Sequence, residues 1–128
     1  MAADGRRLFI VYNADSGLVA AAADWLHKLV SPSTYACDLC ALTHGHLGMR
    51  RQWADLVRRM PLPVETLHRD EWRARFPVDR VPLPAILLGG KEGLQPLVDA
   101  QALGRLADVA ALEALLSDRL SALGLPLR

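Results

Sequence analysis

The sequence predicts an α/β fold in which four strands form one mixed sheet flanked by helices. Residues 8–12 and 85–88 are short, continuous apolar runs, which are typical of strands covered on both faces. Around these runs, other apolar residues recur at helical spacing. A glycine-rich stretch at residues 89–93 predicts a hairpin turn. Together these patterns indicate an α/β architecture.

The first half of the chain predicts a strand, a helix, a polar segment, a second helix and a short strand. The strand at residues 8–12 ends at Asn13, and Asp15 and Ser16 offer helix-capping oxygens. The first predicted helix runs until Ser31 and Pro32 interrupt it, and its apolar positions are Leu18, Ala22, Trp25, Leu26 and Leu29. The second helix, between residues 48 and 61, has an apolar stripe made of Trp53, Leu56, Val57 and Met60.

The second half predicts two antiparallel strands and a closing helix. After a short strand at residues 64–68, Asp70 is expected to cap one or two helical turns that carry Trp72 and Phe76. The strand at 85–88 then turns into a strand at 94–98, where a proline indicates a sheet edge. A short helix follows, and Asp108 is expected to cap the last helix. Crossover helices require parallel pairing first, and a tight turn requires antiparallel pairing later.

Size and composition predict one cytoplasmic domain over residues 1–128. Hydrophobic residues make up 52% of the chain, enough for a core without disulfides or a structural metal. The formal charge of +1 gives no field that favours nucleic acid or anionic lipid, so neither partner is expected. The apolar run at residues 8–12 is too short for a signal peptide or a membrane span. In the cytoplasm, a close cysteine pair indicates redox chemistry or metal binding.

Residues 81–120 carry a resemblance to a known superfamily. They contain the sequence Leu83-Pro84-Ala85-Ile86-Leu87-Leu88, a glycine turn, a short strand and a terminal amphipathic helix. This order resembles the C-terminal half of the thioredoxin-like superfamily, and the likeness implies a thioredoxin-like fold with Pro84 as its cis-proline. The segment at residues 31–43 is also similar to one in small uncharacterised bacterial proteins. The superfamily usually carries its cysteine motif at the first strand-to-helix turn, which here, at residues 13–16, has no cysteine.

The Cys-x-x-Cys pair of Cys37 and Cys40 lies beyond the first predicted helix, and it predicts thiol–disulfide exchange or redox sensing. If a helix begins just before Cys37, both sulfurs lie on one face of it. The Cys37 thiolate would then attack a disulfide, and Cys40 would resolve the mixed disulfide. With Pro84 these are the candidate catalytic residues of a thiol–disulfide oxidoreductase. The expected partner is a protein or a small thiol or disulfide. Asp38 opposes thiolate formation by its charge.

Metal binding is the nearest alternative. Cys37, Cys40, His44 and His46 place four zinc or copper donors within ten residues, and Cys40 and His44 have the spacing of one helical face. The compressed spacing matches no standard zinc finger, although a cuprous ion, satisfied by two thiolates, tolerates it better. A third interpretation is that the cysteines only fill core space. A non-catalytic protein-interaction module, which kept the fold after losing the usual active site, is a further alternative and fits the cysteine-free turn at residues 13–16.

Two other groups of residues follow predicted strands, at positions where α/β proteins often bind ligands. Tyr12, Asn13 and Asp15 follow a central strand, where α/β folds place ligands, so with Pro84 they predict a second-choice pocket. Residues 89–91 read Gly-Gly-Lys after a strand, yet they lack the spacing of a phosphate loop and lead into another strand. Nucleotide hydrolysis is therefore excluded, and no resident cofactor is expected.

Overall fold

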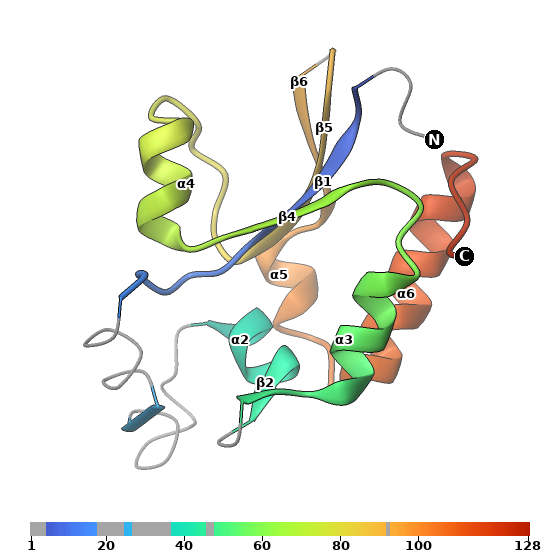
Figure 1. The fold of residues 1–128 in the computed structure, drawn as a ribbon, viewed down its shortest axis with the longest axis horizontal. Helices are drawn as coiled ribbons and strands as arrows, with labels where there is room; N and C mark the ends of the chain where they lie inside the picture. Colours follow the sequence, from blue (N-terminus) through green and yellow to red (C-terminus); the bar gives the residue numbers. More distant parts are fainter. Residues whose placement is uncertain (1–4, 18–24, 27–36, 46–47, 92) are drawn as a thin grey trace.

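Four strands form one mixed sheet in the computed structural model, which describes residues 5–17, 25–26, 37–45, 48–91 and 93–128 (Figure 1). The strand order is β4-β1-β5-β6. The strands are β1 (Arg7–Val11), β4 (Val64–Leu67), β5 (Ala85–Gly90) and β6 (Gly93–Val98). β1 pairs in parallel with β4 and antiparallel with β5, and β5 pairs antiparallel with β6. The predicted α/β class with a four-stranded mixed sheet is confirmed.

β1 is an inner strand that is buried on both faces. Leu8 and Ile10 point into the larger of two cores, whereas Phe9 and Val11 point into the smaller core on the opposite face. All four side chains are at most 5% exposed. Because successive side chains of a strand alternate between faces, burial on both sides requires the unbroken apolar run seen in the sequence.

Strand register brings several chain segments to the same end of the sheet. Val11 lies opposite Leu67 on one side and Ala85 on the other. The residues that follow β1 and β4 therefore meet those that precede β5, and we call this the disulfide end of the sheet. At the other end, the hairpin end, Arg7 pairs with Gly89.

The β5–β6 hairpin is tighter than predicted. Both strands extend to the pair Gly90 and Gly93, so only residues 91–92 connect them. Gly93 has a φ of +98°, a conformation that glycine adopts without strain. β6 is an edge strand as predicted, and Pro96 pairs with Leu87 beside a register shift. An edge strand tolerates this proline because proline has no N–H to donate.

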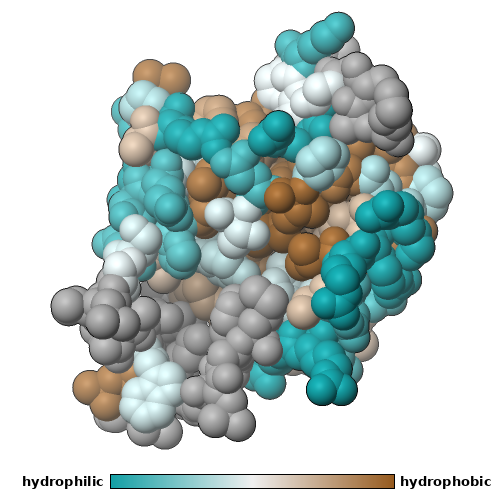
Figure 2. All heavy atoms as spheres, in the orientation of Figure 1, coloured by the Kyte–Doolittle hydropathy of each residue, from teal (hydrophilic) through white to brown (hydrophobic). Residues whose placement is uncertain are grey.

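In the described part of the chain, the helices that cover the larger core are α2 (Asp38–Thr43), α3 (Arg51–Arg58), α5 (Ala100–Leu103) and α6 (Val109–Ala122). α3 and α6 lie side by side (Figure 1). The predicted stripe of α3 is confirmed at Trp53 and Leu56, which are 1% and 0% exposed. Asp108 caps α6, and its carboxylate accepts the Ala111 N–H at 2.8 Å. Figure 2 shows hydrophilic side chains gathered over α3 and α4.

The smaller core lies beneath α4 (Arg69–Arg75). The buried Trp72 ring packs edge-on against Phe9, with ring centroids 5.9 Å apart. The predicted cap at Asp70 is wrong, because His68 occupies the N-cap and forms a capping box with Glu71. The Asp70 carboxylate accepts hydrogen bonds from Ser16 instead.

The structure also corrects the predictions for residues 18–48. Trp25 and Leu26 are helical, but they are 45% and 54% exposed, so the predicted buried stripe is wrong at these two positions. Neither belongs to the larger core. The other predicted stripe positions of that helix lie outside the described residues. The polar segment contains α2 and a small hairpin of β2 (His44–Gly45) and β3 (Gly48–Met49).

Within the described residues, no helix combines the length and apolar character that crossing a bilayer requires.

The packing of α6 predicts that alanine substitutions at two leucines of this region differ greatly in their effect on the free energy of unfolding. Leu112 is fully buried, whereas Leu123 is 41% exposed. We expect Leu112→Ala to lower the free energy of unfolding by about 2–5 kcal/mol, because it removes buried methyl groups and leaves a cavity. The matched control, Leu123→Ala, should cost about 1 kcal/mol or less. Urea denaturation measures both, and similar losses would contradict the assigned orientation of α6.

Candidate functional site: the disulfide end of the sheet

Cys37 and Cys40 form a disulfide at the start of α2. Their Cα atoms are 5.2 Å apart, within the range that a disulfide spans. The expectation that the two sulfurs face each other is met. Cys37 does not lie in the first helical turn, however, because α2 begins at Asp38. It immediately precedes the helix, and Cys40 is the third helical residue.

Two backbone N–H groups donate hydrogen bonds to the Cys37 sulfur. The donors are the amide of Asn13, at 3.3 Å, and the amide of Cys40, at 3.2 Å. Asn13 follows β1, so the first of these bonds fastens the start of α2 to the end of the central strand. Because N–H dipoles point their positive ends at the sulfur, they would stabilise negative charge there after reduction.

Tyr12 and Thr43 hold α2 at the larger core. Thr43 is fully buried, and its hydroxyl donates to the Leu39 carbonyl at 2.8 Å. The hydroxyls of Thr43 and Tyr12 are hydrogen-bonded at 3.4 Å. Burial raises the pKa of the Tyr12 phenol, against the opposing effect of its hydrogen bonds with Thr43 and Trp53. Tyr12 is therefore a neutral packing residue, which is a structural role.

The disulfide is buried. Cys37 is 1% exposed and Cys40 is 6% exposed, and both belong to the larger core. A partner of molecular size therefore has no direct path to the Cys37 sulfur in this conformation. Any exchange reaction requires the chain around the pair to open.

Pro84 lies at the same end of the sheet as the disulfide. The Leu83–Pro84 peptide bond is cis, as the resemblance implies. Pro84 is buried and directly precedes Ala85, whose register partner is Val11. The topology thus places Pro84 beside the chain that leaves β1, and Asn13 of that chain contacts Cys37.

A polar network at this end was not predicted from the sequence. The Arg69 guanidinium donates to the Asp15 carboxylate at 2.9 Å and to the Asn13 side-chain oxygen at 3.3 Å. The amide and hydroxyl of Ser16 donate to the Asp70 carboxylate at 2.8 and 2.6 Å. The turn after β1 is therefore fastened to the first turn of α4.

These contacts give the turn residues roles that the sequence did not predict. Asp15 and Ser16 were expected to cap a helix whose start lies outside the described residues, and in the structure Asp15 binds Arg69 and Ser16 binds Asp70. The second-choice pocket loses support as well, because Tyr12 is buried in the core and Asp15 is ion-paired. Parallel pairing of β1 with β4 is the signal that locates this network, because Asn13 and Arg69 each follow a paired residue by two positions.

Hydrogen bonding also changes the acidity of both carboxyl groups. The hydrogen bond from Arg69 lowers the pKa of Asp15. The hydrogen bonds from the Ser16 hydroxyl and amide lower the pKa of Asp70. Each bond favours the ionised carboxylate over the neutral acid.

Of the four candidate metal ligands, the structure describes the side chains of Cys37 and Cys40 only. His44 belongs to β2, because α2 ends at Thr43, so the expected sharing of one helical face with Cys40 is wrong. The His44 side chain and residue His46 lie outside the described part. Across the ranges that the structure does describe, no group of three or more His, Cys, Asp and Glu side chains is placed to hold a metal ion.

No protein-family model, no curated protein and no solved structure matches this chain. Its function is therefore inferred from the geometry of the site.

The turn network predicts a dependence of stability on pH. Because the native pKa values of Asp15 and Asp70 are lowered, their stabilising contribution is complete above the unfolded-state pKa of about 3.9. It is lost as the pH falls through the lower native values. Ser16→Ala should raise the pKa of Asp70 toward 3.9, measured by carboxyl ¹³C NMR. The pKa of Asp15 is the internal control and should stay constant.

Arg69→Gln is the complementary variant. It should raise the pKa of Asp15, because it removes the charged donor. If Ser16→Ala leaves the pKa of Asp70 unchanged and Arg69→Gln leaves the pKa of Asp15 unchanged, the hydrogen bonds assigned to this turn are wrong.

Proposed function

We propose that Cys37 and Cys40 are the redox-active pair of a thioredoxin-like domain that acts in thiol–disulfide exchange or redox sensing. The observation that carries the proposal is the Cys37 sulfur, which is bonded to Cys40 and accepts two backbone N–H groups. Support for the fold comes from the sheet, whose parallel pairing precedes its antiparallel pairing. The cis peptide at Pro84 agrees with the same resemblance.

Cys37 fits the role of the attacking thiol. In the reduced protein its thiolate attacks one sulfur of a partner disulfide, and the other partner sulfur leaves as a thiolate that takes up a proton. A mixed disulfide between Cys37 and the partner results. The Cys40 thiol then loses its proton and attacks the Cys37 sulfur. The partner leaves as a thiol, and two electrons have passed from the cysteine pair to the partner disulfide.

The two N–H donors act in both halves of this cycle. They stabilise Cys37 as a thiolate when it attacks, and again when it leaves as the pair is reduced in the reverse direction. Among the described residues, no backbone N–H donates a hydrogen bond to the Cys40 sulfur, so the two cysteines have different environments. This asymmetry is what a division into attacking and resolving cysteines requires.

Burial shapes the kind of redox role. Since Cys37 and Cys40 are only 1% and 6% exposed, exchange depends on local opening of the chain. A pair of this kind exchanges slowly with bulk thiols, which favours redox sensing or a dedicated partner over a general reductant. The partner we propose is a protein, or a small thiol or disulfide, that reaches the pair when this end of the sheet opens.

The exchange hypothesis predicts reversible oxidation of the folded protein. Oxidised protein should resist alkylation, and dithiothreitol should add the mass of two hydrogens and make both cysteines alkylatable. Intact mass spectrometry measures both states. Urea below the unfolding transition should accelerate reduction if local opening limits it. A reduced pair that stays reduced in the folded protein against excess glutathione disulfide would contradict the proposal.

Single-cysteine variants test the division of labour. Cys40→Ser should trap a mixed disulfide between Cys37 and glutathione, because the resolving thiol is missing. Cys37→Ser should form much less adduct, since Cys40 lacks the two N–H donors. The two variants are matched controls for each other, and circular dichroism verifies that both fold. Equal adduct formation would show that Cys37 is not the preferred nucleophile.

Metal binding remains the rival proposal, with zinc or copper held by Cys37, Cys40, His44 and His46. Its support is the set of donor types within ten residues. Elemental analysis of reduced protein purified without chelator decides between the two, because this rival requires about one bound ion that is lost in Cys40→Ser. Metal-free protein with an unreactive cysteine pair would favour the third proposal, a non-catalytic interaction module.

A further inference from the structure

An open cavity of about 440 Å³ lies at the hairpin end of the sheet, against the smaller core. This volume is within the range of small-molecule sites. It is formed by the start of β1, the β5–β6 hairpin and the end of α4. The side chains that line it include Arg7, Phe9, Arg75, Phe76, Lys91 and Leu94.

Aromatic and aliphatic side chains supply one wall of the cavity. The rings of Phe9 and Phe76 pack edge-on, with centroids 5.7 Å apart, and Leu94 is half-buried beside them. Gly89 contributes backbone only. A Cβ at this position would lie 2.6 Å from the Phe9 ring, so a larger residue would displace the ring. The wall is therefore apolar and rich in aromatic side chains, which suits an aromatic ligand.

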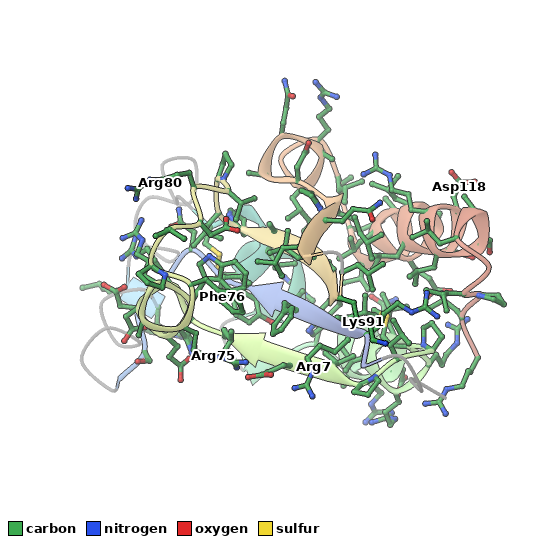
Figure 3. All side chains as sticks on the ribbon, turned by 90° about the horizontal axis from the view of Figure 1, so that it is seen from above. Arg7, Arg75, Phe76, Arg80, Lys91 and Asp118 are labelled. Carbon is green, nitrogen blue, oxygen red and sulfur yellow. A yellow bond between two sulfur atoms is a disulfide. The ribbon has the colours of Figure 1, made fainter. Side chains whose placement is uncertain are left out.

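Three cationic side chains surround this wall (Figure 3). The Arg75 guanidinium lies 5.7 Å from the centroid of the Phe9 ring and 5.5 Å from that of Phe76. Arg7 and Arg75 both form ion pairs with Glu65. Lys91 is exposed and forms no ion pair with any described residue. Three cations thus face one carboxylate among the described residues, and these described side chains together carry net positive charge.

We propose that this cavity binds a small aromatic anion. The ring of the ligand packs against the half-buried Phe76 and Leu94, and Phe9, which is only 5% exposed, backs this wall. The anionic group of the ligand binds Lys91 and Arg7. Neither the cations nor the apolar wall would bind the ligand tightly alone. Exposed ion pairs contribute little to affinity, and an open apolar wall buries only part of a ligand. The combination of an apolar wall with cations at its rim selects the ligand class.

This site is separate from the disulfide. Arg7 and Val11 are the two ends of β1, four residues apart, which corresponds to about 13 Å at about 3.3 Å per residue, and Asn13 lies two residues beyond Val11. Binding at the cavity therefore does not require the cysteine pair, and the inference stands whether or not the proposed redox function holds.

The test uses 2-naphthoate as the probe, followed by ¹H–¹⁵N NMR of the full chain. We expect saturable shifts of the amides of Gly89, Gly90 and Leu94. Binding should weaken with added salt, because screening acts on the charged contacts. The neutral analogue 2-naphthamide should bind more weakly and without salt dependence. Absence of saturable shifts, or equal binding of the two probes, would overturn the proposal.

Charge variants localise the anion. Lys91→Gln should weaken naphthoate binding about threefold to fivefold, the size expected for one exposed charge pair. Arg80→Gln is the matched control, since it removes one exposed positive charge that lies away from the cavity (Figure 3). Its affinity should equal that of the unmodified protein. Equal losses in the two variants would show a non-specific charge effect and overturn the assigned site.

A last arm separates this site from the redox proposal. Naphthoate affinity should be the same for oxidised and dithiothreitol-reduced protein. A large difference between the two would contradict the independence of the cavity from the disulfide.

Discussion

Burial of β1 on both of its faces is the constraint on which the rest of the structure depends. Its side chains alternate between two cores, and its two backbone edges pair with β4 and β5. A shift of the register by one residue would move Leu8 and Ile10 into the smaller core and Phe9 and Val11 into the larger core. The register is therefore fixed, and with it the identity of the residues that meet at each end of the sheet.

Each end of β1 carries a different chemistry for this reason. At the disulfide end, the chain leaving β1 offers the Asn13 amide to the Cys37 sulfur, and Arg69 and Asp70 hold the turn that follows. At the hairpin end, β1 begins beside the glycines of the β5–β6 hairpin, and the missing side chain of Gly89 lets the Phe9 ring lie close to the hairpin at the wall of the cavity. One strand thus positions both candidate sites.

The buried disulfide differs from a cysteine pair that is exposed to solvent. Burial limits the access of bulk oxidants and thiols to the cysteines. After reduction, the two N–H groups would stabilise a Cys37 thiolate in surroundings that are otherwise apolar. Under the proposed redox function, the rate of exchange would depend on how often this region opens. The ion pair and hydrogen bonds of residues 13–16 with α4 add to the stability of the closed arrangement.

The sequence by itself determined those helices and strands whose positions follow from a local pattern of residues. Continuous apolar runs gave the inner strands, Asp108 marked the start of α6, and Pro96 marked an edge strand, because each pattern reflects a local requirement for burial, capping or a missing N–H. Sequence also singled out the Cys37–Cys40 pair. Only the tertiary structure decided that Asp15 and Ser16 bind α4, that the pair is buried at the end of β1, and that Arg7, Arg75 and Lys91 surround one cavity. These relations join residues far apart in the chain, and strand register and packing, which no single segment encodes, bring them together.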